Sequence, residues 1–292
     1  GMTTGWAPED RDDEGWFLQL MGGQGRELAR VSNQAAYDFV EEAGERPFFM
    51  WYAPELPHYP FDARQEYVDL YAGEEFTESA RLYYANASWF DDRLGEFFEY
   101  LDARGKLENT LIVYVNDNGW EQEPDQEFGG DEMRFHNGGD RGKLGTYDQS
   151  FRTPIIFAWP GRIAEGEIRE DLIHGADIPA TILDYLGLEV PGGIYGRSYR
   201  NPIAGDPSGA RDEIVGRVTQ VRWEGDMMGR RMNGYWIRRG PWYMSWDRDS
   251  GATRLFHVVD DPRGDRDVSA DQPELVEELK GRIEAWRAIY ES

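Results

Sequence analysis

An acidic and an amide side chain stand next to each other directly after a short apolar run. The run covers residues 111–115, is rich in β-branched residues, and is followed by Asp117 and Asn118. Continuous apolar runs bounded by turn residues are typical of strands buried in a parallel sheet, where ligands collect at the carboxyl ends. Carboxylate and amide oxygens suit a hard cation, calcium or alternatively magnesium. We therefore consider Asp117 and Asn118 candidate metal ligands.

The same residues also have a simpler interpretation. Asp-Asn-Gly, at residues 117–119, is strong turn chemistry, and on pattern alone a tight turn is the more common outcome. Two ligands also leave a calcium site incomplete, because calcium takes about six to eight oxygens. The pattern by itself leaves the turn and the metal site as alternatives.

Two loops hold the other candidates for chemistry. His58 lies between Pro57 and Pro60, a stiff setting that would pre-position an imidazole for proton transfer or for contact with an anion. Lys143 lies in a glycine-rich segment, where few side chains would keep an anion away. His136 is a weaker candidate of the same kind. The simpler interpretation of all three is a solvent-exposed side chain.

These candidates require a scaffold of strands and helices to position them. The sequence predicts buried strands over residues 48–52, 111–115 and 155–158, and helices over residues 24–43, 63–71, 77–104 and 177–186. Alternating helices and strands are the signature of an α/β fold with a mostly parallel sheet and flanking helices. We expect residues 1–205 to form this α/β domain.

The pattern of residue types along the chain changes after residue 205. Short aromatic-rich runs are separated by turn clusters, which predicts a small antiparallel sheet. An amphipathic helix is predicted over residues 273–290. We expect residues 206–292 to form a C-terminal subdomain of sheet plus helix. The predicted strands are residues 213–218, 235–239, 242–246 and 253–258.

Composition excludes several classes of function. The formal net charge of −25 argues against nucleic acid and anionic membrane as partners, because both would be repelled. The absence of cysteine excludes disulfides, thiolate metal sites and a cysteine nucleophile within this chain. No apolar run is long enough to span a membrane, and no signal-peptide pattern is visible, so the compartment stays open.

Several segments together resemble the C-terminal part of the sulfatase family, within the alkaline-phosphatase-like superfamily. The Pro-His-Tyr-Pro sequence at residues 57–60, after the run at 48–52, resembles the family's strand and its His-x-Pro substrate loop. Asp-Asn-Gly at residues 117–119 is similar to the family's metal motif. Lys143, followed by Tyr-Asp and by Arg-Thr-Pro at residues 152–154, resembles its lysine segment. The resemblance runs from about residue 25 to the end.

The resemblance implies a partial alkaline-phosphatase-like fold and a role for each candidate. Asp117 and Asn118 would ligate a calcium ion that also holds the substrate sulfate. His58 and Lys143 would contact the sulfate and the leaving-group oxygen and stabilise charge as the bond breaks. His136 is an additional candidate for substrate binding. The implied substrate is a sulfated small molecule or carbohydrate.

The family's nucleophile has no counterpart here. It is a hydrated formylglycine, made from the first residue of a Cys/Ser-x-Pro-x-Arg motif. The chain contains no cysteine, and none of its serines begins such a motif. The family's N-terminal paired aspartates are also missing, and Glu55 stands where many relatives have a further histidine. We therefore expect a sulfatase-like chain that lacks its N-terminal part and is inactive alone.

Three functions stay open at this point. The first is a sulfate-ester hydrolase whose nucleophile lies on a separate or upstream segment. The second is a non-enzymatic, truncated binding or structural module, and the third is a phosphoester or phosphonate hydrolase of the same superfamily. The strand at residues 111–115 would lack a neighbour, so we expect self-association or a partner chain that covers the incomplete sheet. The family is often periplasmic or secreted.

Overall fold

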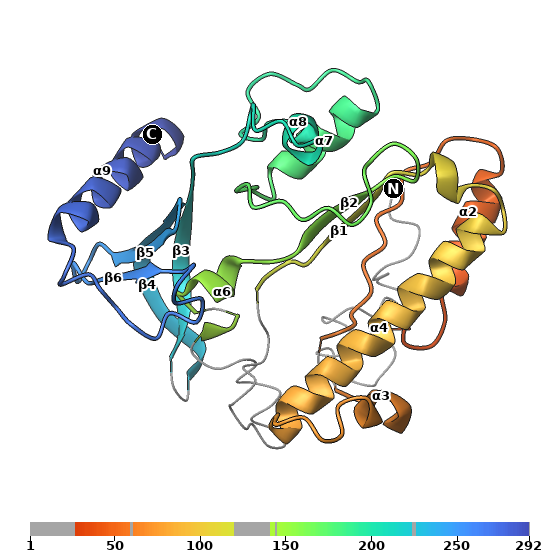
Figure 1. The fold of residues 1–292 in the computed structure, drawn as a ribbon, viewed down its shortest axis with the longest axis horizontal. Coiled ribbons are helices and arrows are strands. Elements are labelled where there is room, and N and C mark those ends of the chain that lie inside the picture. Colours follow the sequence, from red (N-terminus) through yellow and green to blue (C-terminus); the bar gives the residue numbers. More distant parts are fainter. Residues whose placement is uncertain (1–26, 59–60, 120–140, 144, 224–225, 292) are drawn as a thin grey trace. The chain divides into compact units, whose positions relative to one another are not determined.

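A computed structural model describes residues 27–58, 61–119, 141–143, 145–223 and 226–291 (Figure 1). The described residues form two compact units, the first up to Glu108 and the second from Asn109 onward. The first unit holds three helices: α2 (Gln34–Ala43), α3 (Gln65–Asp69) and α4 (Glu78–Asp102). A short 3-10 helix, η3 (Leu107–Asn109), spans the boundary between the two units along the chain. The division into domains at residue 205 stays a prediction.

Helices α2 and α4 form the core of the first unit. Ala36 and Val40 of α2 pack with Phe97 and Leu101 of α4, and all four are buried. Helix α4 begins as predicted, because the Thr77 side chain accepts a hydrogen bond from the Ala80 amide at 3.3 Å.

Helix α2 is shorter at its start than the prediction of residues 24–43. It begins at Gln34, and residues 24–26 lie outside the described part. Ala29 has a φ of 66°, a left-handed conformation that an α-helix excludes, so the helix cannot extend back through it. Its end at Gly44, with a φ of 57°, agrees with the prediction.

The prediction of a buried strand at residues 48–52 is wrong. The segment is extended but pairs with no strand among the described residues. Phe48 and Met50 pack against the core of α2 and α4, whereas Phe49 and Trp51 are 75% and 79% exposed. An apolar run specifies an extended, half-buried backbone, but a strand also needs a second backbone to pair with.

The central strands form an antiparallel pair in the second unit. β1 (Ile112–Val115) pairs with β2 (Ile155–Ala158) in the register Ile112 to Ala158 and Val115 to Ile155. All pairings between named strands in the described part are antiparallel, so the expected mostly parallel sheet is not confirmed. The apolar pattern indicated two strands correctly, but it carries no information about the direction in which they pair.

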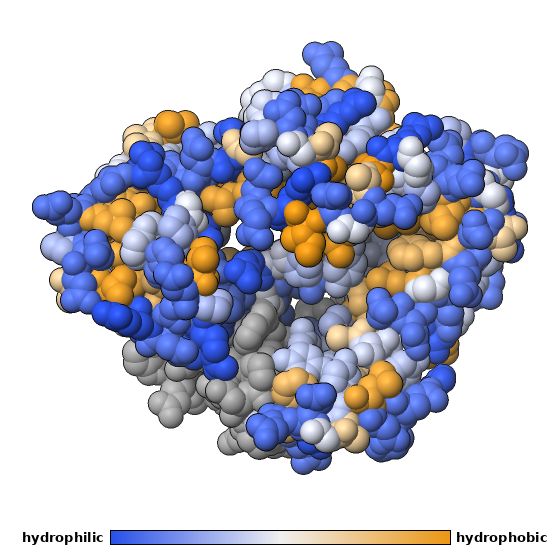
Figure 2. Space-filling model, in the orientation of Figure 1, coloured by the Kyte–Doolittle hydropathy of each residue, from blue (hydrophilic) through white to orange (hydrophobic). Residues whose placement is uncertain are grey.

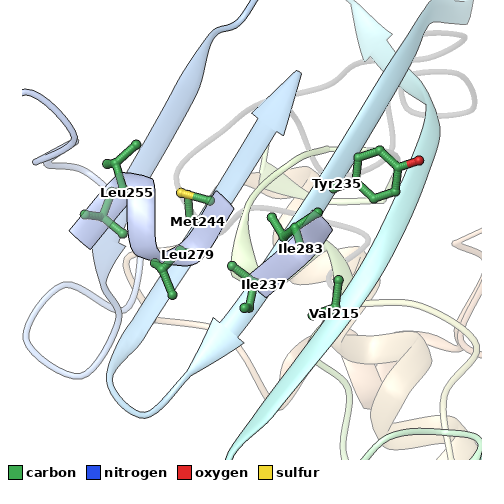
Figure 3. Packing of buried hydrophobic residues seen from close by; sticks show 8 residues of the cluster. Val215, Tyr235, Ile237, Met244, Leu255, Leu279 and Ile283 are labelled. Carbon is green, nitrogen blue, oxygen red and sulfur yellow. The ribbon is translucent and has the colours of Figure 1, made fainter. Parts of the chain in front are cut away.

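The predicted C-terminal antiparallel sheet and helix are confirmed. Strands β3 (Glu213–Trp223), β4 (Asp226–Arg239), β5 (Trp242–Asp247) and β6 (Thr253–His257) form one sheet in chain order. Helix α9 (Pro273–Tyr290) packs on one face of this sheet, where Leu279 and Ile283 meet apolar side chains from the strands (Figure 3). The strand residues of this core include Val215, Tyr235, Ile237, Met244 and Leu255.

The described part of the second unit also contains three shorter helices. α6 (Asp148–Phe151) directly precedes β2, and α7 (Asp177–Tyr185) and α8 (Arg200–Ile203) lie between β2 and β3 along the chain. The prediction found α7 but missed α6 and α8, because helices of one turn carry no periodicity to detect.

Hydrophilic residues cover much of the face shown in Figure 2, in keeping with the net charge of −25, with apolar groups between them. None of the described helices is long and apolar enough to cross a membrane.

Candidate functional site

Asp117 and Asn118 lie at the carboxyl end of a strand, as predicted. They follow the last residue of β1, Val115, by two and three positions. The Asp117 side chain is exposed. The amide Nδ2 of Asn118 donates to the Gly119 carbonyl at 2.8 Å, which leaves its Oδ1 as the acceptor atom. The two residues, adjacent in sequence, therefore each carry a side-chain oxygen acceptor at the strand end.

The position of this turn is fixed by the residues that precede β2. The Gly119 amide donates to the Ser150 carbonyl at 3.1 Å. A Cβ added at Gly119 would lie 1.7 Å from the Gln149 carbonyl oxygen, so only glycine allows this approach. Antiparallel pairing explains the contact, because it places the end of β1 beside the start of β2.

The Lys143 loop is attached to the same short helix. The Gly145 amide donates to the Gly142 carbonyl at 2.9 Å, which closes a turn around Lys143. The hydroxyl of Ser150, in α6, donates to the Arg141 carbonyl at 3.0 Å. The loop and the Asp117 turn thus share Ser150 as an anchor.

The C-terminal sheet holds α6 in place. The buried Tyr243 hydroxyl donates to the Thr146 carbonyl at 3.0 Å. Buried Asp148 lies 3.5 Å from the Arg152 guanidinium and 3.6 Å from that of Arg238 in β4. Burial raises the pKa of Asp148, and the two arginines counter that effect only in part. Sequence reasoning missed this support, since only the Tyr-Asp pair beside Lys143 pointed to it.

In the first unit, the backbone of the His58 loop is held by α4. Asn86, with none of its surface exposed, donates from Nδ2 to the carbonyls of Pro57 at 3.3 Å and His58 at 3.4 Å. Its Oδ1 accepts from the Ala63 amide at 3.0 Å. Arg30 adds a hydrogen bond to the His58 carbonyl at 2.7 Å. Sequence reasoning missed the role of Asn86, which the structure shows buried in α4.

The predicted site residues are thus distributed over the two units. His58 belongs to the first unit, and Asp117, Asn118 and Lys143 belong to the second. His136 lies outside the described residues. The roles of these residues stay a prediction, and the structure shows which local contacts position three of their segments.

The fit to a metal ion can be judged from the donor atoms. Asp117 and Asn118 supply hard oxygen donors, which suit calcium or magnesium. Within the described residues, no group of three or more His, Cys, Asp or Glu side chains could hold a metal ion. The two residues therefore fit the ion in kind but supply only part of its coordination.

Two family models match the chain. The model described as Sulfatase matches residues 4–188. The model described as N-sulphoglucosamine sulphohydrolase, C-terminal, matches residues 141–288. The first covers Asp117, Asn118 and His58, and both cover Lys143.

Curated relatives show the same likeness. An arylsulfatase of Clostridium perfringens is 24% identical over 282 residues, covering 84% of this chain and 53% of the relative. An N-acetylgalactosamine-6-sulfatase of Rattus norvegicus is 27% identical over 188 residues, covering 64% of this chain and 34% of the relative. The chain therefore spans about half, or less, of the length of these relatives.

Solved structures share the fold. The structure of Ps i-CgsB in complex with k-i-k-neocarrahexaose has a TM-score of 0.66 and 21% identity, covering 89% of this chain and 54% of that chain. The structure of BT4656 in complex with its substrate D-glucosamine-2-N,6-O-disulfate has a TM-score of 0.57 and 23% identity, covering 72% of this chain and 40% of that chain.

Proposed function

Because the chain belongs to the sulfatase family, we propose that it carries part of a site for the hydrolysis of a sulfate ester. One observation supports this most directly. The turn with Asp117 and Asn118 and the loop with Lys143 are both hydrogen bonded to Ser150, so oxygen ligands and a cationic segment share one support. A metal-assisted hydrolase acting on an anionic ester needs both kinds of group.

Each residue has a distinct proposed role. Asp117 and Asn118 would hold a calcium ion, which when bound supplies positive charge for an oxyanion, with magnesium as the alternative. The Lys143 ammonium carries three N–H donors and would stabilise charge that develops on the sulfate and leaving-group oxygens. The His58 imidazole, on a backbone that Asn86 and Arg30 hold, would bind sulfate oxygen and protonate the leaving group. His136 is proposed as a further substrate-binding residue.

The nucleophile must come from outside these residues. The 292-residue sequence contains no cysteine and no Ser-x-Pro-x-Arg, so it holds no precursor of formylglycine in the family's motif. We propose that a formylglycine on another segment completes the site, and that the 292-residue chain alone does not turn over substrate.

The proposed substrate is a sulfated carbohydrate or a sulfated small molecule. Relatives include N-acetylgalactosamine-6-sulfatases and an N-acetylglucosamine-6-O-sulfatase of Bacteroides thetaiotaomicron, 30% identical over 126 residues. The fold is shared with structures that hold a carrageenan hexaose and a glucosamine disulfate.

Sequencing the DNA upstream of the Met2 codon tests this proposal. We expect a segment that encodes Cys-x-Pro-x-Arg or Ser-x-Pro-x-Arg in the same reading frame or in an adjacent gene. The product carrying that segment should hydrolyse an aryl sulfate, and the variants Asp117→Ala and Lys143→Ala should lose this activity. If no such segment exists, the enzymatic proposal fails and the non-enzymatic binding or structural module is preferred.

The isolated chain offers a second, independent test. We expect no hydrolysis of an aryl sulfate by the pure 292-residue chain, with or without calcium, because it has no nucleophile. Metal-dependent turnover by the chain alone would contradict the proposal that the nucleophile is supplied from elsewhere.

Hydrolysis of a phosphonate or phosphate ester is the second candidate function. A multifunctional alkaline phosphatase superfamily protein, PehA of Trinickia caryophylli, is 36% identical over 126 residues. A phosphonate monoester hydrolase from Silicibacter pomeroyi shares the fold, with a TM-score of 0.57. Lysine, histidine and a hard cation bind either oxyanion, so assays with matched aryl sulfate and phosphonate esters on the nucleophile-bearing product would separate the two functions.

We also propose that the chain self-associates. In the second unit, Val115 of β1 and Ile156 of β2 are 43% and 54% exposed, and in the first unit Phe49 and Trp51 are more exposed still. Exposed apolar groups on extended backbone favour association, because their burial removes apolar area from water. A second copy presents the same surfaces and is the simplest partner.

A further inference from the structure

A polar cavity in the second unit is lined mainly by arginine. Its volume is about 220 Å³, and its lining residues are Arg197, Arg211, Asp212, Glu213, Arg239 and Arg282. Four arginines in one cavity are notable in a chain with 31 basic and 56 acidic residues. Since one water occupies about 30 Å³ of the liquid, the cavity has room for a small oxyanion together with several waters.

Three of these arginines are held by carboxylates. Arg211 donates from Nε to buried Asp177 at 2.8 Å, and a second nitrogen of its guanidinium donates to the same carboxylate. Arg282 lies 3.0 Å from Glu213 and 3.3 Å from Glu278. Arg239 lies 3.7 Å from Glu213 and also pairs with Glu278. These ion pairs fix the walls of the cavity and balance most of their charge.

Arg197 differs from the other three. Its guanidinium has no ion pair or hydrogen bond with any residue that the structure describes, and the residue is exposed. Its backbone, however, is firmly placed, because the Arg197 amide donates to Asp177 at 2.9 Å. A Cβ on the preceding Gly196 would lie 1.8 Å from the Ala176 carbonyl oxygen, so the backbone packs closely there too. The Arg197 guanidinium therefore lacks an ionic partner among the described residues, while the Arg197 backbone is held in place.

We propose that this cavity binds a tetrahedral oxyanion, either free sulfate or a sulfate group on a saccharide, with Arg197 as the principal contact. Guanidinium groups suit such oxyanions because their planar N–H donors match pairs of oxygens. Carboxylates already pair with three of the four lining arginines, so the attraction of an anion rests mainly on the unpaired guanidinium of Arg197. Because the backbone at Arg197 is already held in place, binding loses less conformational entropy. None of Asp117, Lys143 and His58 lines this cavity, so the proposal does not depend on sulfate-ester hydrolysis.

Calorimetric titration of the 292-residue chain with sodium sulfate, at constant ionic strength against sodium chloride, tests the proposal. We expect saturable binding that Arg197→Gln weakens by about tenfold, because one charged hydrogen-bond partner is lost. We expect Glu213→Gln to tighten it, because a repelling carboxylate is removed while Glu278 still pairs with Arg239 and Arg282. Arg64→Gln, which removes another exposed arginine, should leave the affinity unchanged.

Two further titrations distinguish binding in this cavity from binding at the candidate catalytic residues and identify the source of the anion. Lys143→Gln should leave this binding intact, and loss of binding in that variant alone would overturn the proposal. No saturable binding, or an unchanged affinity in Arg197→Gln, would overturn it as well. Titration with glucosamine 6-sulfate distinguishes the sources, since tighter binding than that of sulfate indicates a saccharide ester and equal binding indicates the free oxyanion.

Discussion

Gly119 packs against the backbone of Gln149 so closely that no side chain fits between them. A Cβ at Gly119 would lie 1.7 Å from the Gln149 carbonyl oxygen. The adjacent hydrogen bond from the Gly119 amide to the Ser150 carbonyl, at 3.1 Å, fixes the same contact. This contact joins the turn of Asp117 and Asn118 to the helix that supports the Lys143 loop.

Replacing Gly119 with alanine should therefore be strongly destabilising. The added methyl must displace the backbone of α6 or of the turn, with an expected loss of about 2 kcal/mol or more in the free energy of unfolding. Urea unfolding measures this. Gly281→Ala in α9 is the matched control, because nothing lies within 4 Å of its Cβ position and alanine favours a helix. Equal stability of Gly119→Ala and the wild type would contradict the described contact.

Asn86→Ala should loosen the backbone of the His58 loop. Its buried amide bonds two carbonyls and one amide of residues 57–63, so truncation leaves buried polar groups without partners. We expect a loss of about 2 kcal/mol in the free energy of unfolding. Nuclear magnetic resonance of the His58 ring should also show a changed environment. Asn201→Ala, at an exposed asparagine that bonds Ser208, should be nearly neutral, and a similar loss there would argue against a specific role of Asn86.

The stability of the chain should fall as the pH is lowered from 7 toward 5, in part because of His174. Burial lowers the pKa of this imidazole, an effect that nearby Arg211 reinforces and Asp177 opposes. The folded pKa is therefore below the unfolded value of about 6.5, so the unfolded chain takes up the proton first and unfolding is favoured. Urea unfolding at several pH values should show a shallower decline in His174→Asn. An identical pH dependence in wild type and variant would contradict this.

The double variant Phe49→Ser and Trp51→Ser should reduce self-association. These side chains are 75% and 79% exposed and would be buried between copies. We expect the dissociation constant to rise by about tenfold or more, from the apolar area no longer buried. Sedimentation equilibrium measures it, with Leu70→Ser as control because that side chain, at the C-cap of α3, is 65% exposed. A wild-type chain that is monomeric at all concentrations would contradict the proposal.

Local patterns predicted much of the fold. The capping hydroxyl of Thr77 and the proline at the start of α9 mark helix boundaries that depend on nearby residues only. The aromatic runs after residue 205, separated by turn residues, predicted the small antiparallel sheet for the same reason, and the order of its strands comes from the structure. The direction in which β1 and β2 pair, and the absence of a strand at residues 48–52, depend on distant segments that no local pattern describes.

The sequence by itself determined which residues are candidates for chemistry: Asp117 and Asn118 by their oxygens, Lys143 by its cation and His58 by its imidazole. It also showed that these 292 residues contain no cysteine and no Ser-x-Pro-x-Arg. Only the tertiary structure decided what holds them. Ser150 joins the turn to the lysine loop, and Asn86 holds the histidine loop from a helix 28 residues away in sequence. The chemistry of a side chain follows from the residue type alone, whereas such contacts form only when segments distant in sequence pack together.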